Sequence, residues 1–318
     1  MRILITGSSG QIGTNLALEC LRNGHSLQGI DIRRNTWTNS FPTTLLDLAA
    51  NAPELDHELS RLPIPDVLIH LAAHAKVHDL VANPRKALEN TVMLFNVLEY
   101  CRRHQVPLMF ASSREVYGEQ CRQPRLEESV NHAQSASPYA ASKLGSEALI
   151  QAYARCYQLR FLILRLSNVF GRFDNDLDRL ERVVPLFVHR IERGLPLRIF
   201  GAQKVLDFTH VDDCVRAFGL GLTQLEAGRI QNETINISGG VGHKLEYVAR
   251  QLGQVLRREP LISFDLSRAG EITHYVGDLT KARSLLGFTP AITLSAGLER
   301  AVQWQLAWKT EASAPVLI

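Results

Sequence analysis

A tyrosine and a lysine four residues apart are the first candidates for chemistry in this sequence. Tyr139 and Lys143 follow Ser137-Pro138, and proline is favoured in the first turn of a helix. At this spacing both side chains lie on one helix face. A nearby ammonium favours the phenolate, so we expect Lys143 to lower the pKa of Tyr139 towards neutrality. The pair predicts a general base that takes the proton of a sugar or alcohol hydroxyl while hydride leaves the same carbon. Taken alone, the same spacing is also common for two solvent-exposed side chains without a catalytic role.

A second polar stretch, Ser112 to Gly118, directly follows the apolar run Val106–Ala111. Ligands bind at the carboxyl edge of parallel sheets, where such a stretch would lie. Ser113 can hydrogen-bond the reacting oxygen and relay a proton to the tyrosine, and Glu115 supplies a second acid. Simpler interpretations remain open: Ser113 as a strand-end cap, Glu115 as a solvated turn residue, and Arg114 as an outward-pointing side chain.

The beginning of the chain has the pattern of a phosphate-binding turn. The apolar run Ile3–Ile5 is followed by Gly7, Gly10 and Gly13, and then by the amphipathic stretch Thr14–Arg22. This order predicts strand, tight turn and helix, with free N–H groups at the helix start facing the phosphates. The glycines permit the turn, the approach of a pyrophosphate and close packing of helix on strand. We therefore predict a dinucleotide site.

The residues after two further strands indicate which dinucleotide. Asp31 ends the strand Ser26–Asp31, about 20 residues after the glycine turn, where an acid can bind an adenosine ribose and repel a 2′-phosphate. This favours NAD over NADP, although Arg33 and Arg34 can accommodate that phosphate. The run His70-Leu71-Ala72-Ala73 ends another strand, and its small residues allow a flat ring to approach. His70 itself fits a structural hydrogen-bonding residue.

Strands and helices alternate through the first half of the chain, which predicts a parallel sheet covered on both faces. The remaining expected strands there are Leu45–Leu48, Asp66–Leu71 and Arg160–Leu166, and the expected helices are Arg85–Arg103 and Pro138–Tyr157. After Ser167 we expect short strands at Leu197–Phe200, Thr234–Ile237 and Leu261–Phe264, and helices at Val183–Arg193, Val211–Leu222, Leu245–Arg257 and Leu294–Trp308. This second half should pack on the first and form a cleft, with a frayed end from Thr310 to Ile318.

Composition narrows the class of protein. The 318 residues have a net charge of +3 and no dense basic stripe, so nucleic acid is not expected. The five scattered cysteines form no C-x-x-C pair, which favours reduced thiols, a cytoplasmic location and no metal site. The apolar start is too short for a signal peptide, and no stretch approaches the ~20 residues of a membrane span.

Taken together, these stretches resemble the extended short-chain dehydrogenases/reductases, the NAD-dependent nucleotide-sugar epimerases and dehydratases. The resemblance runs nearly the full chain. Its motifs are Thr6–Gly13, Asp47-Leu48, His70–Ala73, Asn90, Ser112–Gly118, Pro138–Lys143, Arg165–Gly171, Asp207–Asp213, Arg268–Ile272 and Asp278–Gly287 with Pro290. They are specific for the family and weakly specific for the reaction.

The resemblance implies a Rossmann-type doubly wound parallel sheet with a smaller α/β C-terminal part. It assigns residues 1–167 to NAD and 168–318 mainly to the nucleotide-sugar, and allows the chain to cross between them. The implied catalytic residues are Ser113, Tyr139 and Lys143, with Glu115 added. The implied cofactor residues are Gly7, Ser9, Gly10, Gln11, Ile12, Gly13, Asp31, Asp47, Leu48, Leu71, Ala72, Ala73, Asn90, Tyr139 and Lys143. Asn168, Arg268 and Arg114 are expected at the substrate, and two helices of each chain at a homodimeric four-helix bundle.

Three positions depart from the family's pattern. Leu206 stands where an arginine commonly grips the substrate phosphate, with Lys204 or Arg198 as possible replacements. Lys76 is displaced by one position from the usual lysine, so its cofactor role is in doubt. Arg114-Glu115 replaces the Asp-Glu pair of many dehydratases, and an arginine there suits a carboxylate-bearing sugar.

We therefore expect an NAD-dependent 4-epimerase of a UDP-hexose or UDP-hexuronate that acts through a 4-keto intermediate. One alternative is a nucleotide-sugar dehydratase or UDP-glucuronate decarboxylase that uses Glu115 as acid and base. Another is a non-catalytic dinucleotide-binding regulatory protein, since fold does not dictate function. The sugar itself is not readable from the sequence.

Overall fold

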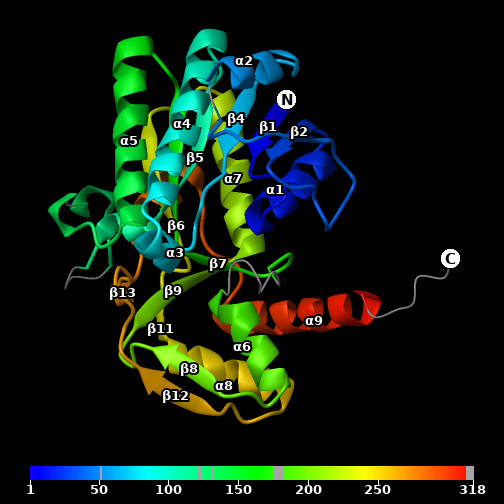
Figure 1. The fold of residues 1–318 in the computed structure, drawn as a ribbon, viewed down its shortest axis with the longest axis vertical. Coiled ribbons are helices and arrows are strands. Elements are labelled where there is room, and N and C mark those ends of the chain that lie inside the picture. The colour runs from blue at the N-terminus through cyan, green and yellow to red at the C-terminus, as the bar shows by residue number, and fades with distance from the viewer. Residues whose placement is uncertain (51, 120–123, 131, 175–181, 313–318) are drawn as a thin grey trace.

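The computed structural model describes residues 1–318 apart from 51, 120–123, 131, 175–181 and 313–318. Its larger lobe is a seven-stranded sheet in the order β10, β6, β5, β4, β1, β2, β3 (Figure 1). The strands are β1 (Arg2–Thr6), β2 (Ser26–Asp31), β3 (Thr43–Leu45), β4 (Val67–His70), β5 (Leu108–Ser113), β6 (Phe161–Leu166) and β10 (Glu233–Ile237). All neighbouring pairs run parallel. This confirms the predicted α/β fold.

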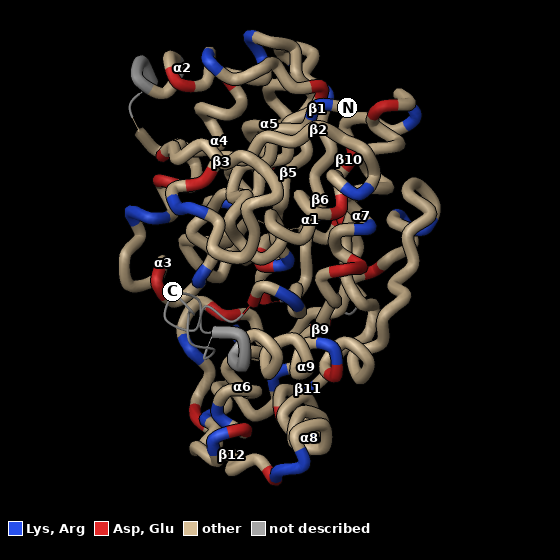
Figure 2. The backbone as a smooth tube through the Cα atoms, turned by 90° about the vertical axis from the view of Figure 1, so that its right-hand side faces the viewer, with Lys and Arg blue, Asp and Glu red and all other residues tan. Residues whose placement is uncertain are grey.

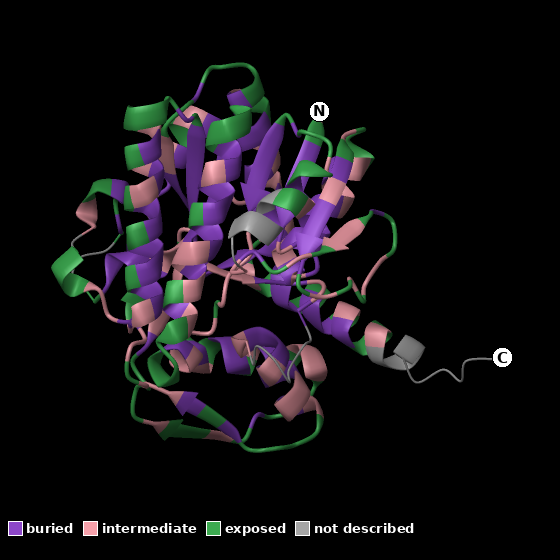
Figure 3. Cartoon of the chain, turned by 45° about the horizontal axis from the view of Figure 1, so that its top comes forward, coloured by how far each residue is buried: buried purple, intermediate pink, exposed green. Residues whose placement is uncertain are grey.

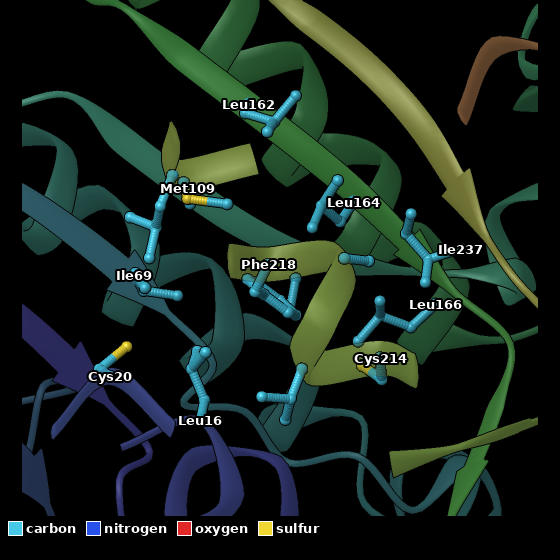
Figure 4. Close-up of a cluster of buried hydrophobic side chains, with 14 of the residues drawn as sticks. Leu16, Cys20, Ile69, Met109, Leu162, Leu164, Leu166, Cys214, Phe218 and Ile237 are labelled. Atoms are coloured by element: carbon cyan, nitrogen blue, oxygen red, sulfur yellow. The ribbon is translucent and has the colours of Figure 1, made fainter. Parts of the chain in front are cut away.

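Helices cover both faces of this sheet, and the strands between them are almost wholly buried (Figure 3). The helices of this lobe are α1 (Gln11–Arg22), α2 (Ala52–Ser60), α3 (Val77–Ala82), α4 (Arg85–His104), α5 (Pro138–Tyr157) and α7 (Val211–Glu226). One face is covered by α1 and α7, and the other by α4 and α5. Figure 4 shows side chains of α1 and α7 interleaved with those of the strands: Leu16, Cys20, Cys214 and Phe218 with Ile69, Met109, Leu162, Leu164, Leu166 and Ile237.

A smaller lobe is built from the second half of the chain (Figure 1). It contains strands β7 (Asn168–Phe170), β8 (Leu197–Phe200), β9 (Val205–His210), β11 (Gly242–Lys244), β12 (Ile262–Asp265) and β13 (His274–Tyr275), and helices α6 (Val183–Glu192), α8 (Leu245–Leu256) and α9 (Leu294–Ala312). Short 3₁₀ and π turns lie at Arg114–Tyr117, Glu127–Ser129, His132–Gln134 and Ala282–Leu286. The chain returns to the larger lobe through α7 and β10, so the two lobes exchange segments.

Several strands differ from the sequence prediction, and β7, β9, β11 and β13 were not predicted at all. Strand β5 continues to Ser113, because two serines at a strand end resemble a loop in sequence. Strand β3 stops at Leu45, since Asp47 turns the chain with its carboxylate accepting the Ala49 N–H at 2.9 Å. Strand β9 was missed because three of its six residues, Asp207, Thr209 and His210, are polar, although all three are buried.

Aromatic contacts join the two lobes. All three tryptophans of the chain take part. The Trp37 ring, in the loop after β2, lies 5.6 Å from that of Trp304 and 4.8 Å from that of Trp308, both on α9. Asn35, in the same loop, donates to the Ser8 carbonyl at 3.2 Å, beside the glycine turn. The smaller lobe therefore packs on the loop that supports the predicted cofactor site.

Neither the charged residues nor the cysteines gather in one part of the described structure. Basic and acidic residues are interspersed over both lobes (Figure 2). Cys20, Cys101 and Cys214 are buried, Cys156 is exposed, and all four are free; Cys121 lies outside the described residues. Among the helices that the structure describes, none is both long and apolar enough to cross a bilayer. Of the predicted frayed end, residues 310–312 belong to α9, and the remainder lies outside the described part.

Candidate active site

The glycine turn between β1 and α1 leaves no room for side chains. Gly7 has a φ of +70°, and a Cβ there would lie 2.7 Å from the Ala72 nitrogen. A Cβ on Gly13 would lie 2.2 Å from the Gly7 carbonyl oxygen. Gly10 caps α1 without any side-chain hydrogen bond, and Gln11, Ile12 and Gly13 line a cavity. The backbone N–H groups at this helix start are therefore open to an anionic group.

Asp31 stabilises this turn from the end of β2. It is 8% exposed, and its carboxylate accepts the Ser9 N–H at 2.9 Å and the Arg33 N–H at 3.0 Å. Ser9 Oγ donates to the Arg33 carbonyl at 2.8 Å. Asp31 lines the cavity, whereas Ser9 does not. We therefore interpret Ser9 as a support for the turn rather than a direct cofactor contact.

The other predicted cofactor residues also divide into lining and supporting groups. Asp47, Leu48 and Leu71–Ala73 line the cavity, and Asn90 does not. Asn90 lies behind the 71–76 loop, where its side chain accepts the His74 N–H at 2.7 Å and donates to the His74 carbonyl at 3.0 Å. Lys76 lines the cavity and lies 3.7 Å from Asp79.

Ser113, Tyr139 and Lys143 meet in one wall of the cavity. Ser137 caps α5 by accepting the Ala140 N–H at 3.1 Å, which starts the helix just before the tyrosine. The Tyr139 side chain lies beside Ser113 at the end of β5, where the serine acts to lower the tyrosine's pKa; Ser113 Oγ also accepts the Glu115 N–H at 3.2 Å. The Lys143 ammonium donates to the Ala111 carbonyl at 2.8 Å and lies 6.0 Å from the centre of the Tyr139 ring. The spacing read from the sequence therefore brings these groups together.

The pKa of Tyr139 does not follow the sequence prediction. Burial raises it to about 12, and the hydrogen bond from Ser113 and the charges of Arg114 and Arg182 oppose that rise only in part. Burial also lowers the pKa of Lys143 to about 8. The prediction of a near-neutral tyrosine was wrong for the chain alone, because desolvation outweighs every influence that lowers the Tyr139 pKa, and Lys143 is not among the largest of these.

A cluster of four charged side chains lines part of the cavity wall. Arg114 Nη2 lies 2.9 Å from Glu115 Oε1, and Lys204 Nζ lies 2.6 Å from Glu271 Oε2. Glu115 is 3% exposed, and burial, more than any other influence, raises its pKa. Its second oxygen, Oε2, has no hydrogen-bond partner in the described structure. Arg114 and Glu115 therefore both point into the site, against the outward-pointing and solvated alternatives.

Arg268 and Asn168, which the sequence predicts at the substrate, both line the cavity. The Arg268 guanidinium lies 3.9 Å from the centre of the Phe200 ring and lines the cavity. Asn168 lines it too, with its amide donating to the Asp207 carbonyl at 2.8 Å. Leu206 is 4% exposed and apolar. Of its two possible replacements, Arg198 pairs with Asp265 at 2.7 Å and Lys204 with Glu271.

Sequence reasoning did not single out several groups in this wall. Asp174 is 5% exposed, lines the cavity and has its pKa raised to about 7 by burial. Arg182 lies 3.4 Å from Asp174 and donates to the Gln11 side chain. No motif marks Asp174 or Arg182, because the fold alone brings them beside the glycine turn. Glu271 stands inside a recognised motif but had no assigned role.

All these walls enclose one cavity of about 930 Å³ that is lined by both lobes. Its glycine-lined end fits a dinucleotide: side chains are excluded at Gly7 and Gly13, α1 begins there without a side-chain cap, and a buried acid ends β2. Ser113, Tyr139 and Lys143 line the same cavity, and Arg268 lines it from the smaller lobe. This volume is at the upper end of ordinary ligand sites.

Fold and site together define an α/β protein with a dinucleotide cleft and a serine–tyrosine–lysine set at the carboxyl edge of its sheet. The sequence profile of the NAD dependent epimerase/dehydratase family matches residues 3–238, so the chain belongs to that family. This confirms the predicted extended short-chain dehydrogenase/reductase membership and agrees with NAD as the predicted cofactor.

Relatives include both kinds of enzyme that the family name combines. The chain is 30% identical to an uncharacterized UDP-glucose epimerase of Bacillus subtilis, over 96% of this chain and 98% of the relative. It is 29% identical to a dTDP-glucose 4,6-dehydratase of Neisseria meningitidis, over 97% and 94%. The crystal structure of a Thermotoga maritima UDP-glucose 4-epimerase with UDP-glucose superposes with a TM-score of 0.89, at 28% identity, over 98% of this chain and 100% of the other.

Proposed function

We propose that this protein is an NAD-dependent 4-epimerase of a UDP-linked hexose or hexuronate. The observation that carries the proposal is that Ser113, Tyr139 and Lys143 line the same cavity as the glycine turn and Arg268. Residues 1–167 serve mainly the cofactor and residues 168–318 mainly the nucleotide-sugar, with the chain crossing back through α7 and β10. The similarity to a UDP-glucose 4-epimerase over nearly the whole chain supports this assignment.

Each residue of the wall has a role in this reaction. The Tyr139 oxygen takes the proton of the sugar 4-hydroxyl, and Ser113 holds that hydroxyl and relays the proton. The Lys143 ammonium favours the phenolate, and Arg114 and Arg182 act in the same direction. The glycine turn and Asp31 would hold NAD⁺, which would supply the hydride acceptor and donor that epimerisation at C4 needs. Asn168 and Arg268 hold the nucleotide and its phosphates while the 4-keto sugar turns.

The direct test is the conversion of UDP-sugars by the purified protein. We expect UDP-glucose or UDP-glucuronate to yield its 4-epimer, resolved by chromatography and identified by NMR of the sugar C4 proton. A preparation that retains NAD yet releases no 4-epimer from any UDP-hexose or UDP-hexuronate would contradict the proposal. Release of a dehydrated or decarboxylated product would identify the alternative reaction.

The surroundings of Glu115 support a second candidate function, dehydration or decarboxylation of the nucleotide-sugar. Its buried carboxyl has a raised pKa and an unpartnered oxygen, as a proton donor for elimination needs. A dehydratase or decarboxylase shares the first oxidation and then loses water or CO₂. The epimerase remains our main proposal, because Glu115 Oε1 already pairs with Arg114 and no aspartate precedes it.

Glu115→Gln separates these two reactions. In an epimerase we expect most of the turnover to survive, because neither proton transfer at O4 uses this carboxyl. In an eliminating enzyme we expect a loss of roughly 10²-fold or more and accumulation of the 4-keto sugar, since the general acid is gone. Borohydride trapping followed by mass spectrometry measures that sugar. Glu271→Gln, which changes the neighbouring carboxylate, is the matched control for a general disturbance of the charged cluster.

We propose that the protein is a homodimer through α4 and α5. These helices pack side by side, and their outer face exposes Leu88 and Phe95 on α4 and the small residues Ala141 and Ala148 on α5. Exposed apolar side chains on one helix, next to small side chains on its neighbour, are typical of a surface that packs against the same helices of a second chain. The predicted cytoplasmic location and UDP as the nucleotide remain part of the same proposal.

A charge on this face should prevent pairing. We expect the double variant Leu88→Glu, Phe95→Glu to shift the molar mass measured by light scattering from a dimer to a monomer, because two buried carboxylates per chain cannot be solvated in the interface. Leu266→Glu is the control, since this leucine is 91% exposed in the other lobe. A wild-type protein that is already monomeric would refute the dimer without affecting the proposed reaction.

A further inference from the structure

The active-site tyrosine and lysine belong to a longer ladder along α5. Tyr139, Lys143 and Glu147 follow one another at intervals of four, so all three face the same way. Each contacts a different one of the last three residues of β5, namely Ser113, Ala111 and Ser112. The Ser112 hydroxyl donates to Glu147 Oε1 at 2.5 Å. The third step of this ladder is not used in the reaction described above.

Glu147 is a buried and fully engaged carboxylate. It is 7% exposed, and Arg165, on the neighbouring strand β6, donates from Nε to Oε1 at 2.9 Å and from Nη2 to Oε2 at 2.6 Å. The paired guanidinium is itself buried, and its pKa is raised by Glu147. Such a bidentate contact fixes the orientation of the carboxylate.

The Lys143 ammonium is surrounded mainly by uncharged groups. Above it lies the Phe110 ring, whose centre is 4.6 Å away, and the Ala111 carbonyl accepts its proton. From β4 it faces His70, which is neutral because burial and the lysine lower the pKa of the imidazole to about 3. From its own helix it faces the neutral Tyr139 and the anion Glu147, behind which lies Arg165. Among these groups, Glu147 is the one anion.

We propose that Glu147 is a positioning residue that keeps the Lys143 ammonium charged beneath Tyr139, with Arg165 and Ser112 holding the carboxylate in place. The inference rests on the proposed function for its catalytic meaning. Burial lowers the pKa of Lys143 to about 8, and the charge of Glu147 acts against that fall. Without this anion, burial and the uncompensated Arg165 charge would both favour the neutral amine, which cannot stabilise a phenolate.

Glu147→Gln tests this role, because glutamine keeps the shape and an oxygen for Ser112 and Arg165 but removes the charge. We expect the pKa of Lys143 to fall by roughly one unit or more. The chain has only seven lysines, so ¹³Cε-labelled lysine and NMR can follow Lys143 directly, with its signal assigned by Lys143→Arg. Since protonated Lys143 is lost as pH rises through its pKa, the alkaline limb of kcat/KM should move to lower pH by the same amount.

Glu127→Gln is the matched control. Glu127 is a buried carboxylate of the same network, 7% exposed, whose Oε1 accepts the Asn236 N–H at 2.8 Å and whose carbonyl accepts from Arg165. The Glu127→Gln substitution disturbs packing and hydrogen bonding around Arg165, but the Glu127 side chain does not face Lys143. We expect this variant to lose stability while its Lys143 titration and its alkaline limb stay at the wild-type pH.

The outcomes separate the inference from the proposed function. A Lys143 titration that is equal in Glu147→Gln and in the control overturns the inference, whatever the enzyme catalyses. A shifted titration in a protein that converts no nucleotide-sugar leaves the charge coupling intact and refutes the function. Should Glu147→Gln not fold, Glu147→Asp draws the anion back by one methylene. We expect a smaller fall in the Lys143 pKa there, and no fall would likewise overturn the inference.

Discussion

Tyr139→Phe should lower kcat for nucleotide-sugar turnover roughly 10²- to 10⁴-fold, the range of a lost general base. The ring packs with Leu80 and Ala87, and phenylalanine keeps those contacts while it removes the hydroxyl beside Ser113. The glycine-lined end of the cavity is unchanged. We therefore expect the variant to fold and to retain NAD, with the loss confined to the chemical step. Turnover, melting temperature and bound NAD are measured on one preparation.

Tyr100→Phe is the control for this loss. Tyr100 is a buried tyrosine on α4, 4% exposed, whose hydroxyl has no hydrogen-bond partner among the described residues and does not line the cavity. We expect wild-type turnover in this variant. If Tyr139→Phe also kept wild-type turnover, the tyrosine would not be the base, and the non-catalytic dinucleotide-binding alternative would gain support.

Gly13→Ala should abolish tight NAD binding and destabilise the fold. The new Cβ would lie 2.2 Å from the Gly7 carbonyl oxygen and 2.8 Å from Ser8 Cα. Both are backbone atoms that cannot rotate away, so α1 must move off the turn and carry its N-terminal N–H groups with it. Overpacking of this kind costs roughly 1–3 kcal/mol or more. Thermal unfolding measures the loss of stability, and calorimetric titration with NAD measures the loss of affinity.

Gly219→Ala gives the matched comparison. Gly219 lies inside α7, and no atom lies within 4 Å of its added Cβ. Alanine is favoured over glycine in a helix by about 1 kcal/mol, so this variant should be as stable as the wild type or more stable. A Gly13→Ala protein that bound NAD normally would show that this turn is not the phosphate site.

The sequence was most informative where function depends on short spacing. Tyr139 and Lys143 are four residues apart on one helix, and the capping serine and proline before them are adjacent in sequence. The glycine turn and Asp31 likewise follow from one strand–turn–helix–strand unit. Ser9 and Asn90 belong to the same motifs, yet they support loops rather than line the cavity, because a motif does not show which way a side chain points.

The charged residues beside Glu115 and the glycine turn that come from the second half of the chain were harder to predict. Lys204 and Glu271 are 67 positions apart, yet their side chains pair beside Glu115. Arg182, which pairs with Asp174, reaches Gln11 at the glycine turn across 171 positions. Such contacts arise from how the lobes pack, and no local pattern encodes them.

Local spacing along the chain was enough to predict the parallel α/β fold, the glycine turn, Asp31 and the Ser113–Tyr139–Lys143 set, because backbone sterics and side-chain periodicity act over a few residues. The ionisation of that set, by contrast, depends on how the folded chain covers it. Burial raises the pKa of Tyr139 to about 12 and lowers that of Lys143 to about 8, and Glu147 opposes the latter from the next turn of the same helix. Desolvation depends on every segment that covers a group, so it exists only once the chain has folded.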